Sequence, residues 1–277
     1  MASISLQAGI RANLVALQSV SETQQQIQAR LGSGRKVASP VDNPDAFFTA
    51  SNLTSRAGDL AARLDHIAQG VKTLRAASAA VASLSEMLVQ ARGLAEYARA
   101  LPTDASSDRQ TVARDFNTMV AQADLVVKDA KYDGINLLLG ESLVVEFAGV
   151  AGESSARLDG FDATSGGSVV TIGAQDPVDW STDNAAIESA IEAIKSSVRN
   201  LEIQSLGLDT NLGVLTSRRV ATEEMVDILK KGAADLTNAD TEAETAAYLA
   251  NASRQSFALR ALTLSSESTQ SVLRLFA

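Results

Sequence analysis

The chain has 277 residues, a net charge of −9 and no cysteine. The absence of cysteine excludes disulfide scaffolds, thiolate metal sites and cysteine nucleophiles, and the negative charge argues against general nucleic-acid binding, which needs a basic surface. Hydrophobic residues make up 45% of the chain but aromatic residues only 4%, a composition that suits narrow seams between packed helices.

The N-terminal segment carries a thin apolar face. Residues 4–33 place apolar side chains at helical spacing, but Ser21 to Gln28 is mostly polar, so a solitary helix would be only marginally stable. The segment also lacks the features of a cleaved secretory signal, and no window approaches the roughly 18 apolar residues of a membrane span. We expect a cytoplasmic chain or one exported without a cleaved signal.

Long helices are predicted next. Between Pro44 and Pro102, apolar residues recur alternately four and three positions apart, as in the seam of a left-handed coiled coil. The two prolines bracket one predicted helix of roughly 55 residues. A second predicted helix covers 112–130, with caps expected at 104–107, and a third keeps the heptad pattern over 187–236. Together the three predict an antiparallel helical rod.

The middle of the chain, residues 141–185, differs from its flanks. Leu143–Phe147 and Ser168–Ile172 are short β-type runs flanked by glycine. The stretch 149–167 is rich in Gly, Ser and Asp and predicts a loop. We expect a small hairpin-and-loop region, too short to be a catalytic domain.

The C-terminal segment, like the N-terminal one, has too thin an apolar face for a stable solitary helix. After a break in the heptad phase at 235–240, residues 245–277 again carry a thin apolar face. The two ends are expected to be disordered in the monomer, and to fold by packing against each other and against neighbouring copies. The predicted fold is therefore mainly α: an elongated antiparallel helical rod with paired N- and C-terminal coiled-coil helices and a small central β-hairpin.

No residue set predicts an enzyme or a cofactor site. The single histidine, His66, lies in a heptad helix and is expected to be solvated, so neither a zinc site nor a Ser-His-Asp triad is built. Residues 32–36 lack the full phosphate-loop pattern and a preceding buried strand. The acidic clusters 42–45 and 235–240 lack the spacing of a calcium loop, and capping and turn formation explain them better.

Four motifs in the expected order resemble those of bacterial flagellins, and together they span nearly the whole chain. They are Leu31–Asp45, Tyr132–Leu138, the turn Asp235–Asp240 followed by Glu242 or Glu244, and the ending Gln270–Phe276. The resemblance implies five parts: an inner helix and spoke at 1–40, rod helices at 41–140, the hairpin region at 141–185, a rod helix at 186–240 and an inner helix at 241–277.

The resemblance also implies a function. Flagellins are secreted, non-enzymatic subunits that polymerise into the extracellular filament for swimming, and they are exported unfolded through the flagellar type III apparatus. The implied partners are further copies of the chain, an export chaperone, the filament cap and the hook–filament junction proteins, with no nucleic acid, membrane or cofactor. The expected self-assembly residues are Ile10, Leu14, Leu17, Leu31, Leu259, Leu262, Val272, Leu273 and Phe276.

The family's innate-receptor region corresponds to residues 86–97 here. Leu94 stands where the family has its contact leucine, whereas Gln90 stands where an arginine is frequent. We therefore expect only weak recognition by Toll-like receptor 5.

Two other functions compete with that of a filament subunit. A hook–filament junction protein shares the terminal helices but serves as an adaptor, and it should not extend long filaments from seeds. The flagellin-like ending Val272–Phe276 favours the filament subunit. A hydrolase carried on a flagellin scaffold needs an inserted catalytic domain, which residues 141–185 cannot hold.

Overall fold

The computed structural model describes residues 2–147 and 154–275, and it is mainly helical, as expected. The chain forms two compact units: unit 1 comprises residues 1–56 and 228–277, and unit 2 comprises residues 57–227. The elements are, in chain order, α1 (Ala2–Ser33), α2 (Pro44–Ala100), α3 (Ser106–Asp129), β1 (Ser142–Glu146), β2 (Ser155–Asp159), α4 (Pro177–Thr182), α5 (Asn184–Thr237) and α6 (Thr241–Leu275).

Helix α2 begins and ends where the prolines predict. Pro44 occupies the first helical position, where its missing N–H leaves no bond unmade. The preceding Asn43 caps the helix, because its Oδ1 accepts a hydrogen bond from the Ala46 N–H at 3.1 Å. The helix ends at Ala100, and Pro102 follows after one non-helical residue, Leu101. The resulting helix has 57 residues, close to the predicted length.

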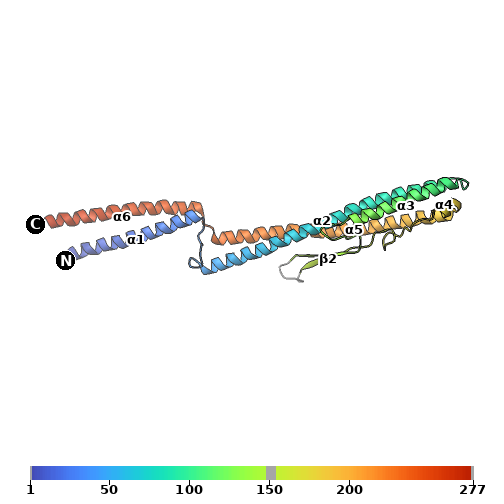
Figure 1. Cartoon of the computed structure of the whole chain (residues 1–277). Helices are drawn as coiled ribbons and strands as arrows, with labels where there is room; N and C mark the ends of the chain where they lie inside the picture. The colour runs from blue at the N-terminus through green and yellow to red at the C-terminus, as the bar shows by residue number, and fades with distance from the viewer. Residues whose placement is uncertain (1, 148–153, 276–277) are drawn as a thin grey trace. The chain divides into compact units, whose positions relative to one another are not determined.

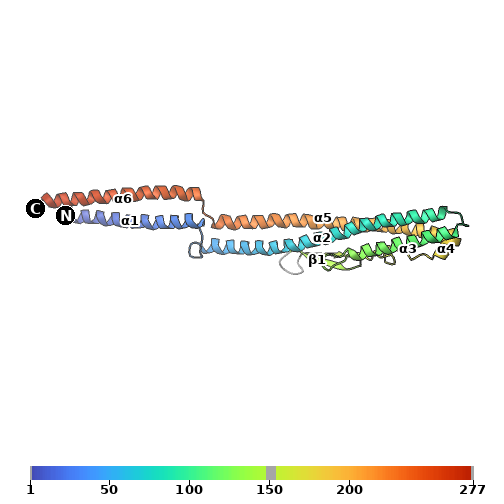
Figure 2. The same cartoon turned by 45° about the horizontal axis from the view of Figure 1, so that its top comes forward.

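In unit 2, α2, α3 and α5 lie side by side, with α3 and α5 antiparallel to α2 (Figures 1 and 2). The predicted three-helix arrangement is therefore confirmed. Apolar side chains from all three helices form one continuous core. The heptad face of α5 is buried as its spacing predicts, at Ile187, Ile194, Leu201, Leu208 and Leu215.

The buried face of α2 is wider than the predicted seam. Ala77 and Leu84 are fully buried, whereas their heptad neighbours Ser78 and Ser85 are only partly buried. The reason is that α2 packs against two helices, α3 and α5, and a two-helix seam would cover a narrower stripe. The heptad spacing thus locates the face correctly but underestimates its width.

The start of α3 differs from the prediction, and its end is capped by a side chain from later in the sequence. The residue preceding α3 is Ala105, which makes no side-chain cap, so the capping role expected of residues 104–107 is wrong. At the other end, the buried Asn136 Nδ2 donates to the Val127 and Lys128 carbonyls at 2.8 and 3.2 Å. The chain reaches that position through a tight turn at Asp133 and Gly134, both of which have positive φ.

The central sheet has two antiparallel strands. β1 confirms the strand predicted at Leu143–Phe147, and it pairs with β2 in the register Leu143↔Leu158. The second predicted strand, Ser168–Ile172, is wrong, because the real partner lies within the stretch 149–167 that was predicted to be loop. Val169, Val170 and Ile172 are buried in the helical core instead, so their apolar run reflects burial and not strand pairing.

The hairpin is fixed to both long helices of unit 2. On α2, Arg63 Nη1 lies 2.8 Å from Glu146 Oε2, and Gly70 leaves room for Val145, whose Cγ2 would lie only 2.8 Å from a Cβ at that position. On α5, the Arg218 guanidinium lies over the Phe147 ring, 5.3 Å from its centroid. The hairpin therefore contacts both helices, at two points on α2 and at one on α5.

Candidate assembly interface

In unit 1, the N-terminal helix α1 and the C-terminal helix α6 pack along each other, so the predicted pairing of the two ends is confirmed. Both views show the termini at the same end of this pair (Figures 1 and 2). The partly or fully buried positions recur alternately three and four residues apart in each helix, the pattern of a coiled-coil seam. The positions in this alternation are Ile10, Asn13, Leu17, Val20, Gln24, Ile27 and Leu31 on α1, and Glu244, Tyr248, Asn251, Gln255, Ala258, Leu262 and Ser265 on α6, while Ser21 and Ala252 beside them are partly buried as well.

This seam is weak because many of its positions are polar. Asn251 is buried, and its Nδ2 donates across the pair to the Val20 carbonyl at 2.8 Å. The buried Gln24 Oε1 has no hydrogen-bond partner among the described residues. Polar seam residues fix the register of a coiled coil at a cost in stability. The pair is therefore held in one register without the dense apolar core that unit 2 has.

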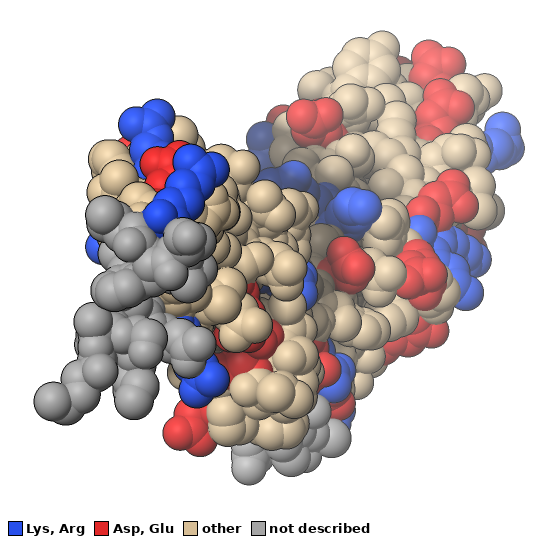
Figure 3. Space-filling model, turned by 90° about the vertical axis from the view of Figure 1, so that its left-hand side faces the viewer, with Lys and Arg blue, Asp and Glu red and all other residues tan. Residues whose placement is uncertain are grey.

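Large apolar side chains also point away from the seam. On α6, Leu249, Phe257 and Leu264 are 62%, 66% and 69% exposed. Their spacing of eight and seven residues keeps them on one face, which lies opposite the seam. On α1, Leu14 and Val15 are exposed as well. Figure 3 views the end that carries the termini, where uncharged surface lies between Lys, Arg, Asp and Glu side chains.

The predicted assembly residues divide between these two faces. Ile10, Leu17, Leu31 and Leu262 lie in the intramolecular seam, whereas Leu14 and Leu259 are exposed. Phe276 and the side chains of Val272 and Leu273 lie outside the described part of the chain. The prediction missed Val15 on α1 and the exposed face of α6, although the seven- to eight-residue spacing of Leu249, Phe257 and Leu264 would have indicated the latter.

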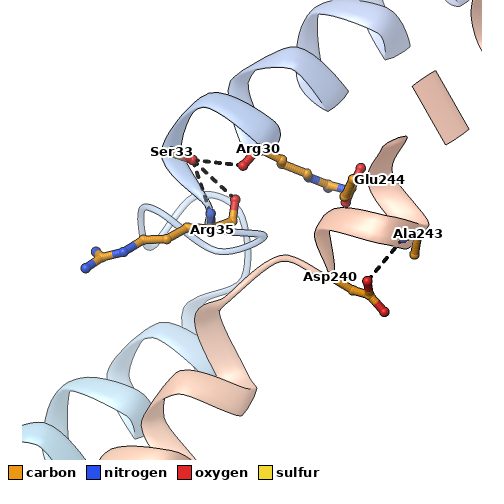
Figure 4. A network of polar contacts seen from close by, with 6 residues as sticks. All are labelled: Arg30, Ser33, Arg35, Asp240, Ala243 and Glu244. Atoms are coloured by element: carbon orange, nitrogen blue, oxygen red, sulfur yellow. Dashed lines mark hydrogen bonds and ion pairs between the residues drawn. The ribbon is translucent and has the colours of Figure 1, made fainter. Parts of the chain in front are cut away.

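The helix pair is joined to the rest of unit 1 by two short crossings that bind each other. The Lys36 N–H donates to the Thr237 carbonyl at 2.8 Å, and the Ala239 N–H donates to the Gly34 carbonyl at 2.9 Å. Gly34 has φ of 67°, which only glycine adopts readily. Arg30 Nη1 reaches Glu244 Oε1 at 3.2 Å, while the Arg35 side chain points away from that pair (Figure 4).

The two acidic clusters serve in capping and turn formation, as predicted: Asp240 caps a helix, and Asp42 closes a turn. Asp240 Oδ1 accepts from the Glu242 and Ala243 N–H groups at the start of α6. Asp42 Oδ2 accepts from the Ser39 and Ala38 N–H groups. These backbone hydrogen bonds, chiefly the one from Ser39, hold the pKa of the Asp42 carboxyl below its usual value.

A groove of 750 Å³ runs beside these crossings within unit 1. Its apolar wall includes Ile27, Ala243 and Ala247, and its polar rim includes Arg30 and Glu244. Arg30 and Glu244 pair with each other, and Lys36 Nζ donates to the Asp235 carbonyl at 2.9 Å.

The histidine and the acidic side chains were the remaining candidates for a chemical site. His66 is exposed on α2, as predicted. Over residues 2–147 and 154–275, no cluster of three or more His, Cys, Asp or Glu side chains has the geometry to hold a metal ion. Within the same residues, no helix is both long enough and apolar enough to cross a membrane.

The two residues of the expected receptor region differ in exposure. Gln90 is exposed on α2, whereas Leu94 is partly buried and packs against the core of unit 2. Only the polar member of the pair is therefore fully presented to solvent.

Comparison with known proteins identifies the family. Residues 4–142 match the model described as the bacterial flagellin N-terminal helical region. Flagellin FljM of Caulobacter vibrioides is 26% identical over 274 residues, with 95% of each chain covered. The flagellin of Brucella melitensis is 23% identical over 283 residues, with 100% of this chain and 99% of the relative covered.

A solved structure shares the fold. It is that of a flagellar hook-associated protein from Vibrio parahaemolyticus, 16% identical, with a TM-score of 0.58 over 71% of this chain and 100% of that one. The family match covers half of the chain, and both of these full-length relatives are flagellins. The chain therefore belongs to the bacterial flagellins, in a short form, and is a non-enzymatic structural subunit of the extracellular flagellar filament.

Proposed function

We propose that copies of this filament subunit associate through the terminal pair of α1 and α6. The observation that carries the proposal is the apolar face of α6 at Leu249, Phe257 and Leu264, which nothing in the described chain covers. Burying such side chains against neighbouring copies gains about 25 cal/mol per Å² of apolar area. The gain is available only in the polymer, since the seam of the pair uses the opposite face.

The same proposal explains the weak seam. With Asn13, Gln24, Asn251 and Gln255 among its positions, the pair gains little from its own packing. The unfolding of both helices in the free monomer stays a prediction, and neighbouring copies would supply the missing burial on assembly. A pair that folds only with its neighbours would restrict polymerisation to the growing end.

The proposal assigns a structural role to each part of the chain. Residues 1–40 and 241–277 would form the inner helices and spoke, residues 41–140 and 186–240 the rod, and residues 141–185 the hairpin region. Terminal segments that fold late also suit export of the unfolded chain through the flagellar type III apparatus. The expected partners on that route are an export chaperone, the filament cap and the hook–filament junction proteins.

Removal of residues 268–277 tests the proposal. The truncated monomer should lose filament growth from seeds, because the end of α6 is no longer available to pair with α1 and with neighbouring copies. Its rod should melt as in the full-length monomer, since unit 2 does not include the deleted residues. Filament growth can be measured by electron microscopy and light scattering. If the truncated chain grew as fast as the full chain, the proposal would be wrong.

Weak recognition by Toll-like receptor 5 is a second proposal, supported by the glutamine at position 90 and by the partial burial of Leu94. In reporter cells, the purified monomer should signal weakly, and Gln90→Arg should increase the response because it restores the charge frequent in the family. Strong signalling by the unsubstituted monomer would contradict the proposal.

A further inference from the structure

The buried side chain of Arg109, at the start of α3, lacks partners for most of its hydrogen-bond donors. The residue is 0% exposed. Its Nη2 donates to Asn184 Oδ1 at 2.5 Å, but its Nε and Nη1 have no partner among the described residues. Within the same residues Arg109 forms no ion pair. Because a guanidinium is always charged and a buried charge is ordinarily paired, this cation still needs a counter-charge.

Two helix N-termini add positive charge close by. The starts of α3 and α5 lie together at one end of unit 2 (Figures 1 and 2). Arg109 links them, since it belongs to α3 and its guanidinium reaches Asn184, the first residue of α5. Each start carries roughly half a positive elementary charge. The start of α3 has no side-chain cap, and the first turn of α5 contains no acidic residue.

The acidic residues nearest in sequence do not neutralise the guanidinium. Asp108 and Asp183 are both exposed. Asp183 Oδ1 accepts from the Ala185 N–H at 2.8 Å, so that carboxylate is engaged with the backbone at the start of α5. Glu188 Oε1 lies 4.0 Å from Arg99 Nη1 of α2. Each of these acids therefore faces solvent or another partner.

The acceptor on the Arg109 guanidinium belongs to an exposed residue. Asn184 is exposed, so its side chain can turn into solvent and uncover Nη2 without disturbing the core. Asn184 Oδ1 supplies one acceptor to one nitrogen, whereas a guanidinium presents its donors as a fork that matches two oxygens. An oxyanion in place of the Asn184 amide would bond Nη2 and a neighbouring nitrogen together. It would also bring the missing negative charge.

We propose that the Arg109 guanidinium and the start of α5 bind a small oxyanion, such as inorganic phosphate or sulfate, which enters by displacing the Asn184 side chain. The fork of donors favours an oxyanion over chloride, because two oxygens match two parallel N–H groups. The helix start adds a favourable dipole for the same charge. The site lies within unit 2, apart from the terminal helices, and the bound anion fastens α3 to α5.

Thermal unfolding of the full-length monomer in sulfate tests the site, with light scattering to verify that no filaments form. When sulfate replaces chloride at constant ionic strength, the melting midpoint should rise along a saturating curve. The rise should be on the order of 2–4 °C at about five times the dissociation constant. Sulfate also stabilises proteins in general by its exclusion from their surface, but that effect does not saturate.

Two arginine variants separate binding from the general effect of sulfate. Arg109→Met removes the donors and should abolish the saturating rise. Arg114→Met, at an exposed arginine of the same helix, is the matched control and should retain it. A saturating rise of equal size in both variants would overturn the proposal, as would its absence from the unsubstituted chain.

Asn184→Ala gives a test that does not depend on the folding of Arg109→Met. This variant takes away the acceptor and uncovers the guanidinium, so in chloride it should melt below the unsubstituted chain. In sulfate it should recover most of that difference, and half-saturation should occur at a lower sulfate concentration because no side chain competes with the anion. A purely structural role of Asn184 predicts the same difference in both salts, and that result would overturn the proposal.

Discussion

Replacing Gly160 by alanine should destabilise unit 2 by about 3 kcal/mol or more, the upper range for overpacking against groups that cannot move. Gly160 follows β2 at a point where the chain passes directly over the turn after α3. Its N–H donates to the Glu141 carbonyl at 3.0 Å, and the Phe161 N–H donates to the Leu137 carbonyl at 2.7 Å. A Cβ on Gly160 would collide with those two backbone oxygens.

The expected loss of stability is large because backbone atoms surround the position that a Cβ on Gly160 would take. A flexible side chain could rotate away, but the Glu141 and Leu137 carbonyls belong to the turn that also positions β1. Gly166→Ala is the matched control, since a Cβ at Gly166 in the same loop meets no atom within 4 Å. Equal urea midpoints for the two variants would show that the close approach at Gly160 does not exist in solution.

Replacing Asn136 by alanine should cost about 3 kcal/mol, the sum expected for buried backbone groups that lose their partners. The side chain is 1% exposed. Its Nδ2 donates to two carbonyls at the end of α3, and its Oδ1 accepts from the Leu138 N–H at 2.9 Å. Alanine would leave these groups buried without those hydrogen bonds, at the turn that directs the chain into β1.

Two further variants separate capping from simple loss of packing. Asn136→Asp keeps the acceptor for the Leu138 N–H but loses both donors and places a negative charge against two carbonyls, so it should be at least as unstable as Asn136→Ala. Asn52→Ala, at an exposed helical position, should leave the midpoint nearly unchanged. The measurement is chemical denaturation, and an Asp variant as stable as the original chain would contradict the capping role.

The long helices could be predicted from the sequence because their evidence is local and repeated. Heptad spacing and flanking prolines fix the length of α2 and the buried face of α5 without knowledge of the partner. The middle of the chain lacks such repetition. An apolar run such as Ser168–Ile172 is equally compatible with a strand and with a buried loop, and only the packing against the helices decides between them.

The sequence spacing predicts which residues of the terminal helices take part in packing, but not which face of the helix each one occupies. Sequence spacing located apolar positions on both terminal helices, yet it did not show that Leu17 and Leu262 face the seam while Leu14 and Leu259 are exposed. That distinction depends on how the partner helix is rotated. Gly160 gave no local signal at all, because its role comes from backbone that lies about 20 residues away in sequence, at Glu141 and Leu137.

The double attachment of the hairpin has a mechanical consequence. Arg63 on α2 pairs with Glu146, and Arg218 on α5 lies over Phe147, the next residue along the chain. A slip of α5 along α2 by one helical turn, about 5.4 Å, would move these two anchors apart by the same distance. Adjacent residues cannot follow both anchors at once, so one attachment must break. The hairpin therefore opposes sliding of α5 along α2.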